Sequence, residues 1–191
     1  MIKKAKKALK ALFSLMLLGD IDLRFADESA FCLTSNVPYG WIRVGEQHGI
    51  SSSKHGKLNV FGLLNYQGEL TSYTTTQRVD SAQIIEWMED FINTMKQKTV
   101  VVMDNAPWHT SVLMTAKIIE WKSRGLEIFF LPPYCPHLNI IEVLWRKMKH
   151  EWLRPQDFNE KLALHDRIDA ILDNYGDDLF DIEFDLDQML S

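Results

Sequence analysis

Cysteine is scarce in this sequence. Cys32 and Cys135 are the only two among 191 residues, and they stand in unlike contexts with no paired spacing. A disulfide framework or a cysteine-rich zinc site needs more cysteines at regular spacings. The scarcity therefore predicts a reduced protein of the cytoplasm.

Long apolar runs are also missing. The run from Ala11 to Leu18 is too short to span a membrane, and no membrane partner is expected. Its basic start resembles a signal peptide, but no small-x-small cleavage site follows. The apolar residues instead share one face of a helix that Gly19 ends, made of Leu9, Leu12, Phe13, Met16 and Leu17. We expect residues 1–19 to form an amphipathic linker or docking helix.

A glycine-rich phosphate loop is a third absence. The stretch VVVMD, ending at Asp104, resembles the acidic strand of an ATPase. No glycine-rich loop ending in Lys-Ser or Lys-Thr accompanies it, so a nucleotide-binding domain is disfavoured.

Charge is unevenly divided along the chain. Residues 1–155 hold 19 Lys and Arg against 15 Asp and Glu, whereas residues 156–191 hold 2 against 11. The body is mildly basic, which is compatible with a nucleic-acid partner despite the acidic total. We expect the acidic tail, from about Asp177 to Ser191, to pack loosely as a solvated end. The alternative is a strand or helix that docks on a partner or shields the basic third helix.

Hydrophobic patterns define the elements between these ends. Strands are expected over 21–27, 58–65, 69–75, 99–103 and 126–131, with a short strand-like segment at Trp41–Val44 and an exposed loop at Gly49–Lys57. Helices are expected over 80–95, 110–124, 140–153 and 160–175. Short turns make the first three strands antiparallel, and helical crossovers make the last two parallel. This order predicts an α/β ribonuclease H-like mixed sheet flanked by helices, over residues 20–155, followed by a C-terminal helix and tail over 156–191.

Three carboxylates fall where such a sheet would gather them. Asp27 ends the first strand, Asp104 ends the strand Thr99–Met103, and Glu142 lies near the start of the third helix. Oxygen donors without a His or Cys cluster suit Mg²⁺ or Mn²⁺, and two such ions can serve both the attacking and the leaving oxygen. Without a cation the carboxylates repel, which should raise each pKa.

Several of these residues have simpler interpretations. Asn139 and Glu142 also match a capping box, in which Glu142 bonds back to the backbone. His109 could touch a phosphate or a metal-bound water, or cap the helix expected at 110. Asn105 could orient Asp104 or shape its turn. The basic residues of the third helix are either a solvated face or phosphate contacts; they are Arg146, Lys147, Lys149, His150 and Arg154.

Three blocks of the sequence resemble the catalytic blocks of mariner-superfamily DDE transposases, notably the bacterial insertion-sequence branch. They are FADES around Asp27, VVMDNAPWH around Asp104 and LPPYCPHLNIIEVLW around Glu142. The resemblance implies a catalytic domain that cuts transposon ends and joins them to target DNA with Mg²⁺ or Mn²⁺. It also implies metal roles for Asp27, Asp104 and Glu142, two ions, and a homodimer on DNA.

The sequence departs from the family pattern in three ways. Ile140 stands where members have proline, which is favoured at a first helical position. The gap between Asp104 and Glu142 is 37 residues (142 − 104 − 1), longer than usual. Helix-turn-helix modules are not recognisable, so a fragment or truncated copy is expected. The alternative function is an inactive remnant that only binds DNA or a transposase weakly.

Overall fold

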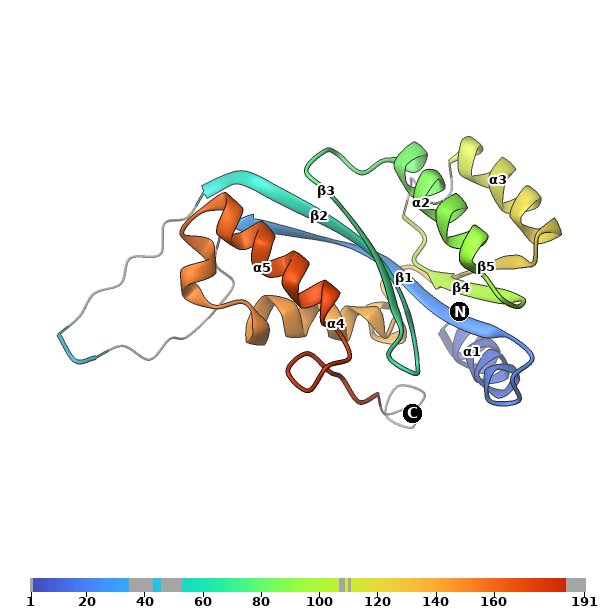
Figure 1. The fold of residues 1–191 in the computed structure, drawn as a ribbon. Coiled ribbons are helices and arrows are strands. Elements are labelled where there is room, and N and C mark those ends of the chain that lie inside the picture. Colours follow the sequence, from blue (N-terminus) through green and yellow to red (C-terminus); the bar gives the residue numbers. More distant parts are fainter. Residues whose placement is uncertain (1, 35–42, 46–52, 107–108, 110, 185–191) are drawn as a thin grey trace.

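A five-stranded mixed sheet forms the centre of the molecule (Figure 1). The computed structural model describes residues 2–34, 43–45, 53–106, 109 and 111–184. The strand order is β3-β2-β1-β4-β5, and the strands are β1 (Asp22–Leu33), β2 (Ser53–Asn65), β3 (Leu70–Thr75), β4 (Thr99–Met103) and β5 (Leu126–Phe130). β2 pairs antiparallel with β1 and β3, whereas β4 pairs parallel with β1 and β5. The predicted mixed sheet is confirmed.

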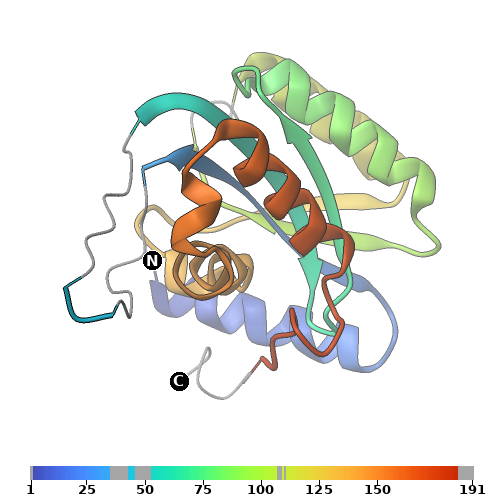
Figure 2. The same cartoon turned by 60° about the vertical axis from the view of Figure 1, so that its left-hand side comes forward.

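Helices cover both faces of this sheet (Figures 1 and 2). They are α1 (Ile2–Leu17), α2 (Ser81–Thr94), α3 (Val112–Ser123), α4 (Ile141–Lys147) and α5 (Lys161–Asp173). Alternation along the strands supplies each face, because successive side chains point to opposite sides. Val100 and Val102 join the core with α1, α4 and α5, whereas Val101 and Met103 join the core with α2 and α3.

The basic N-terminal segment is docked on the sheet. Leu9 and Phe13 of α1 are buried, and the Phe13 ring stacks on Phe25 of β1 with centroids 5.8 Å apart. Leu17 departs from the predicted apolar face, since it is 70% exposed. None of the described helices is long and apolar enough to cross a membrane.

The first two strands are longer than the sequence predicts. β1 continues to Leu33, so Asp27 lies in mid-strand rather than at the end. The reason is the long β1–β2 ladder, which pairs backbone groups regardless of weak local strand preference. β2 starts at Ser53, so part of the loop expected at 49–57 is strand. Of the strand expected at 41–44, only Arg43 and Val44 are described, and neither is in a strand.

The C-terminal half also differs from expectation. The single helix expected at 140–153 is α4 followed by a π-helical turn, Met148–Trp152. The acidic tail is not loose as far as it is described, because Phe180 and Ile182 are each only 8% exposed. Phe180 packs edge-on against Trp152, with ring centroids 5.4 Å apart. Apolar burial outweighs the solvation of the neighbouring acids there. Residues 185–191 lie outside the described part.

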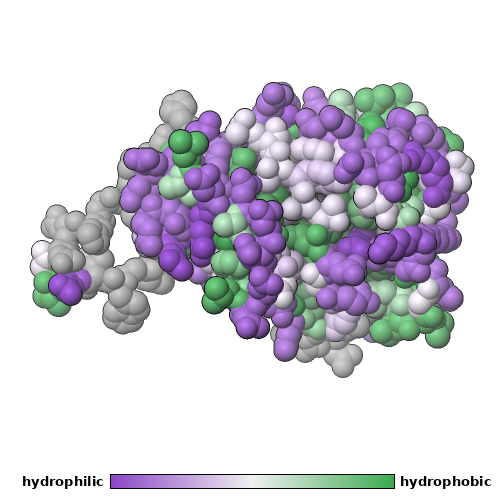
Figure 3. Space-filling view, in the orientation of Figure 1, coloured by the Kyte–Doolittle hydropathy of each residue, from purple (hydrophilic) through white to green (hydrophobic). Residues whose placement is uncertain are grey.

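Most of the face seen in Figure 3 is hydrophilic. Apolar side chains gather at its upper right, in the region of α3. Val112 and Leu113, at the start of α3, are 89% and 53% exposed. Some exposed apolar surface is normal on folded proteins.

Glu89 ties α2 to α3. Its carboxylate accepts hydrogen bonds from Trp121 Nε1 at 2.9 Å, from Lys117 Nζ at 3.0 Å and from Arg124. Led by the Trp121 hydrogen bond, these donors lower the pKa of Glu89 to about 2. The stabilisation is therefore present above pH 4.5 and lost as pH falls towards 2. We expect Glu89→Gln to cost about 1–3 kcal/mol at pH 7, measured by urea unfolding, and the cost should shrink below pH 4. An equal cost at both pH values would contradict this role.

Candidate functional site

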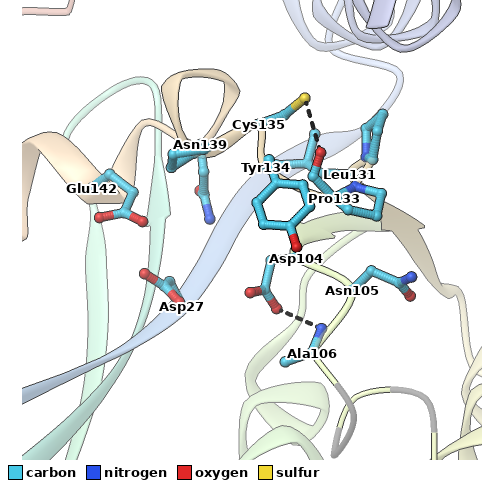
Figure 4. Close-up of a pocket in the computed structure, with 12 residues that line it drawn as sticks. Asp27, Asp104, Asn105, Ala106, Leu131, Pro133, Tyr134, Cys135, Asn139 and Glu142 are labelled. Carbon is cyan, nitrogen blue, oxygen red and sulfur yellow. Dashed lines mark hydrogen bonds between the residues drawn. The ribbon is translucent and has the colours of Figure 1, made fainter. Parts of the chain in front are cut away.

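A pocket of about 310 Å³ opens where β1, the end of β4, the loop after β5 and the start of α4 meet (Figure 4). All three carboxylates singled out in the sequence line it, as do Asn105 and Asn139. The other lining residues are Ala106, Leu131, Pro132, Pro133, Tyr134, Cys135 and Pro136. The structure thus brings together residues that are as much as 115 positions apart (142 − 27).

Asp27 projects into this pocket from the middle of β1. Burial raises its pKa to about 8, and the charges of Glu142 and Glu28 add to the shift. Trp145 of α4 donates a hydrogen bond from Nε1 to Asp27 Oδ2 at 3.2 Å. The sequence analysis did not identify this contact. Asp27 is therefore a carboxyl group that favours its proton until a positive charge arrives.

Gly62 of β2 explains how α4 comes so close to Asp27. It is the register partner of Asp27 across the β1–β2 ladder. A Cβ at this position would lie 2.8 Å from Ile141 Cδ1 and 3.0 Å from Trp145 Cη2. The missing side chain lets the start of α4 rest on the strand, and α4 carries both Trp145 and Glu142.

Asp104 follows β4 and has a different environment. Its Oδ1 accepts hydrogen bonds from the Ala106 amide at 3.0 Å and from His109 Nδ1 at 2.8 Å. The His109 hydrogen bond is the main cause of a lowered pKa for Asp104. The expectation of a raised pKa is thus wrong for Asp104, because its hydrogen bonds from His109 and from the Ala106 amide outweigh the effect of burial. It holds for Asp27 and for Glu142, whose pKa is raised mainly by burial.

Glu142 lies in the first turn of α4, and its carboxylate faces Asp27 in Figure 4. The capping-box interpretation is wrong. The N-cap residue is Ile140, with no side-chain hydrogen bond at the helix start. Asn139 instead donates from Nδ2 to the Ala26 carbonyl at 3.1 Å, which fastens the helix start to β1. Its Oδ1 is buried and has no hydrogen-bond partner among the residues that the structure describes.

The loop between β5 and α4 forms the rim. Tyr134 sits there at a φ of 59°, which is unusual for a bulky residue, and its side chain is 98% exposed. Pro133 and Pro136 flank this part of the loop and line the pocket. The rim thus presents an aromatic ring to solvent beside the carboxylates.

The basic residues predicted to bind DNA are not equivalent. Lys149 is half-buried with its Nζ 5.4 Å from the Phe31 ring centroid. Burial lowers its pKa, while the charges of Glu142 and Asp27 oppose that shift. Lys147 pairs with Glu151 at 2.6 Å instead. Arg146 and Arg154 are exposed and outside the lining of the pocket.

His109 neither caps a helix nor faces solvent. The N-cap of α3 is Ser111, whose side chain accepts from the Met114 amide. His109 is fully buried, with its Nε2 3.0 Å from Glu28 Oε1. The charges of Glu28 and Asp104, with their hydrogen bonds, outweigh burial and raise the pKa of His109 to about 10. Asn105 is exposed and lines the pocket.

The chemistry of this donor set fits a hard cation. Every donor is an oxygen, and the buried Asn139 Oδ1 and the crowded Asp27 carboxyl would both gain from a positive charge. Among the described residues, no three His, Cys, Asp or Glu side chains already form a metal-binding group. The oxygen donors line one pocket, and their side chains would have to move closer together to bind an ion.

Comparisons with known proteins agree with this fold. The sequence profile of the DDE superfamily endonucleases matches residues 22–165. None of the curated proteins matches the chain. Among solved structures, the catalytic domain of Mos1 mariner transposase is similar, with a TM-score of 0.61, 13% identity, and coverage of 93% of this chain and 83% of that chain.

Two further Mos1 structures are similar. The Mos1 mariner paired-end complex with Mn has a TM-score of 0.64 and 15% identity, covering 93% of this chain and 56% of that chain. The complex with Mg has a TM-score of 0.64 and 14% identity, covering 94% and 56%. The chain spans little more than half the length of these Mos1 chains. At such identities the likeness concerns the fold, and it confirms the predicted ribonuclease H-like architecture.

Proposed function

Since this chain belongs to the DDE superfamily endonucleases, we propose that it is the catalytic domain of a DNA transposase. It would cleave phosphodiesters at transposon ends and transfer the cut strands into target DNA. The observation that carries the proposal is that Asp27, Asp104 and Glu142 line the same pocket. Each of the three comes from a different part of the fold: β1, the end of β4 and α4. Such a set of carboxylates suits metal-assisted phosphoryl transfer.

Asp27, Asp104 and Glu142 would hold two Mg²⁺ or Mn²⁺ ions, with Asn139 Oδ1 as a further oxygen. Bound ions would supply charge stabilisation to the attacking and leaving oxygens of the phosphodiester. Asp104 is ready for this role, because its pKa is lowered. Asp27 must release its proton, so binding should strengthen as pH rises towards 8. Trp145 would hold Asp27 Oδ2 in place meanwhile.

DNA would approach the pocket over the basic residues that follow Glu142 in the chain. Lys149, whose Nζ packs on Phe31 of β1 and whose pKa responds to the charges of Glu142 and Asp27, would contact a phosphate near the cleaved bond. The exposed Arg146 and Arg154 would contact phosphates farther along, whereas the Glu151 pairing makes Lys147 a weaker contributor. Tyr134 could stack on an unpaired base at the rim. A homodimer assembled on DNA in the cytoplasm completes the proposal.

A nicking assay on supercoiled plasmid tests the activity. With millimolar Mn²⁺ present, the wild-type chain should nick the plasmid. Asp104→Asn should abolish nicking, and Glu142→Gln should reduce it by about 10²-fold or more. Glu127→Gln, a change on the exposed part of β5, is the matched control and should stay active. DNA binding without nicking in the wild type would favour the inactive remnant instead.

A further inference from the structure

A buried histidine links two carboxylates at the edge of the candidate site. His109 is 0% exposed, its Nδ1 is 2.8 Å from Asp104 Oδ1, and its Nε2 is 3.0 Å from Glu28 Oε1. Each ring nitrogen therefore lies within hydrogen-bond distance of one carboxylate oxygen, and His109 bridges Asp104 and Glu28.

The bridge through His109 lies where backbone pairing between β1 and β4 has ended. The parallel ladder between β1 and β4 ends at the pair Phe25 and Val102, before either strand reaches its aspartate. Glu28 follows Asp27 on β1, so its side chain leaves the opposite face of the strand. Glu28 and His109 thus connect β1 to the segment after β4 where backbone pairing no longer does.

The two oxygens of Asp104 are used differently. Oδ1 accepts from both His109 and the Ala106 amide. Oδ2 has no hydrogen bond within the described part of the chain, and Asp104 lines the pocket. One oxygen is fastened to the protein, which leaves the other for an external ligand.

We propose that Glu28 and His109 are positioning residues that fix Asp104 Oδ1 and so aim Oδ2 at a divalent cation. This inference rests on the metal site of the proposed function. It deepens that function by assigning Glu28 and His109 to support a metal ligand without touching the cation themselves. Glu28 holds the His109 ring, and His109 holds the carboxylate. Outer partners of this kind orient metal ligands in many sites.

The rival interpretation is that His109 only stabilises the fold. Two substitutions separate the interpretations, because an Asn amide nitrogen lies near the position of His Nδ1 and a Gln amide nitrogen near that of His Nε2. His109→Asn keeps a donor for Asp104 and loses Glu28. His109→Gln keeps a donor for Glu28 and loses Asp104. Each variant keeps one of the two carboxylate contacts and loses the other, so the two variants should melt at similar temperatures.

The test is Mn²⁺ affinity of the full chain at 20 °C, followed by the electron paramagnetic resonance signal of free Mn²⁺, with melting curves to show that each variant is folded. His109→Gln should bind Mn²⁺ about 10-fold more weakly than wild type, and His109→Asn should stay within about 3-fold. Glu28→Gln keeps an acceptor for Nε2 and leaves the contact between His109 and Asp104 in place, so it should also stay within about 3-fold of wild type. The matched control is His165→Gln, which removes a ring whose Nε2 is 3.1 Å from the Gly56 carbonyl and should leave affinity unchanged.

The outcomes distinguish this proposal from the function on which it rests. Equal affinities for His109→Asn and His109→Gln would overturn the positioning role. So would an unchanged affinity in His109→Gln, if Asp104→Asn abolishes binding in the same assay. A wild-type chain that binds no Mn²⁺, or binds it equally well after Asp104→Asn, would overturn the metal site and the positioning role together.

Discussion

Asp27→Asn should make the metal-free protein more stable. In the folded chain Asp27 holds its proton up to about pH 8, whereas in the unfolded chain it ionises near 3.8. Between these values the unfolded state binds fewer protons, so folding stability falls as pH rises. Asn does not titrate and can still accept from Trp145 Nε1. The gain should be on the order of 2–4 kcal/mol at pH 7.5, or roughly 5–12 °C in Tm.

The pH dependence identifies the cause of this gain. The difference in Tm between Asp27→Asn and wild type should be small at pH 4.5, grow up to pH 8 and then level off. Adding Mn²⁺ should raise the Tm of wild type but not of the variant. Asp166→Asn, an exposed change on α5, is the control and should shift little. A destabilised Asp27→Asn at pH 7.5 would refute the unfavourable burial of this carboxyl.

Gly62→Ala should damage both the fold and the pocket. The new Cβ would meet Ile141 Cδ1 at 2.8 Å, which is closer than real contacts allow. The Ile141 and Trp145 side chains would have to shift, and because both are buried on α4 we expect the helix start that carries Glu142 to move with them. Overpacking of this kind costs about 1–3 kcal/mol. We expect Mn²⁺ affinity to fall about 10-fold or more, as when a ligand loses its support.

A second substitution checks that the contact is responsible. Ile141→Val deletes the Cδ1 atom, which is the nearest neighbour of the new methyl group. The double variant should recover part of the stability and of the Mn²⁺ affinity lost by Gly62→Ala. Recovery should be incomplete because Trp145 Cη2 is still 3.0 Å away. Additive losses in urea unfolding would show that Gly62 acts in some other way.

Local patterns in the sequence were enough to predict the order of strands and helices along the chain and the mixed sense of the strands. The run Thr99–Met103 is buried throughout, as its apolar residues indicate, and Asp104 follows it directly. Asp27 and Asp104 then come together because β1 and β4 are neighbours. The block around Glu142 marked the third lining carboxylate before the structure placed it.

Contacts between distant segments could not be predicted in the same way. Glu28 and His109 are 81 residues apart (109 − 28), and nothing local to either marks them as partners. Gly62 carries no side chain, so only the position of α4 reveals its importance. The tail was misjudged because its many acids obscured the apolar contribution of Phe180 and Ile182. β1 was judged too short because pairing with β2, rather than local preference, sets its length.

The early end of the β1–β4 ladder makes the two sides of the pocket differ in how easily they open. Asp27 stays paired with Gly62 in a long antiparallel ladder, so its amide should exchange with deuterium only when much of the sheet unfolds. Asp104 and Ala106 lie beyond the last β1–β4 pair, where opening is local. A ligand that joins both sides would therefore have its greatest effect on the side that holds Asp104. The strand that holds Asp27, where amide exchange is slow, would act as a fixed anchor. The segment that holds Asp104, where amide exchange is faster, would set the rate at which the pocket closes.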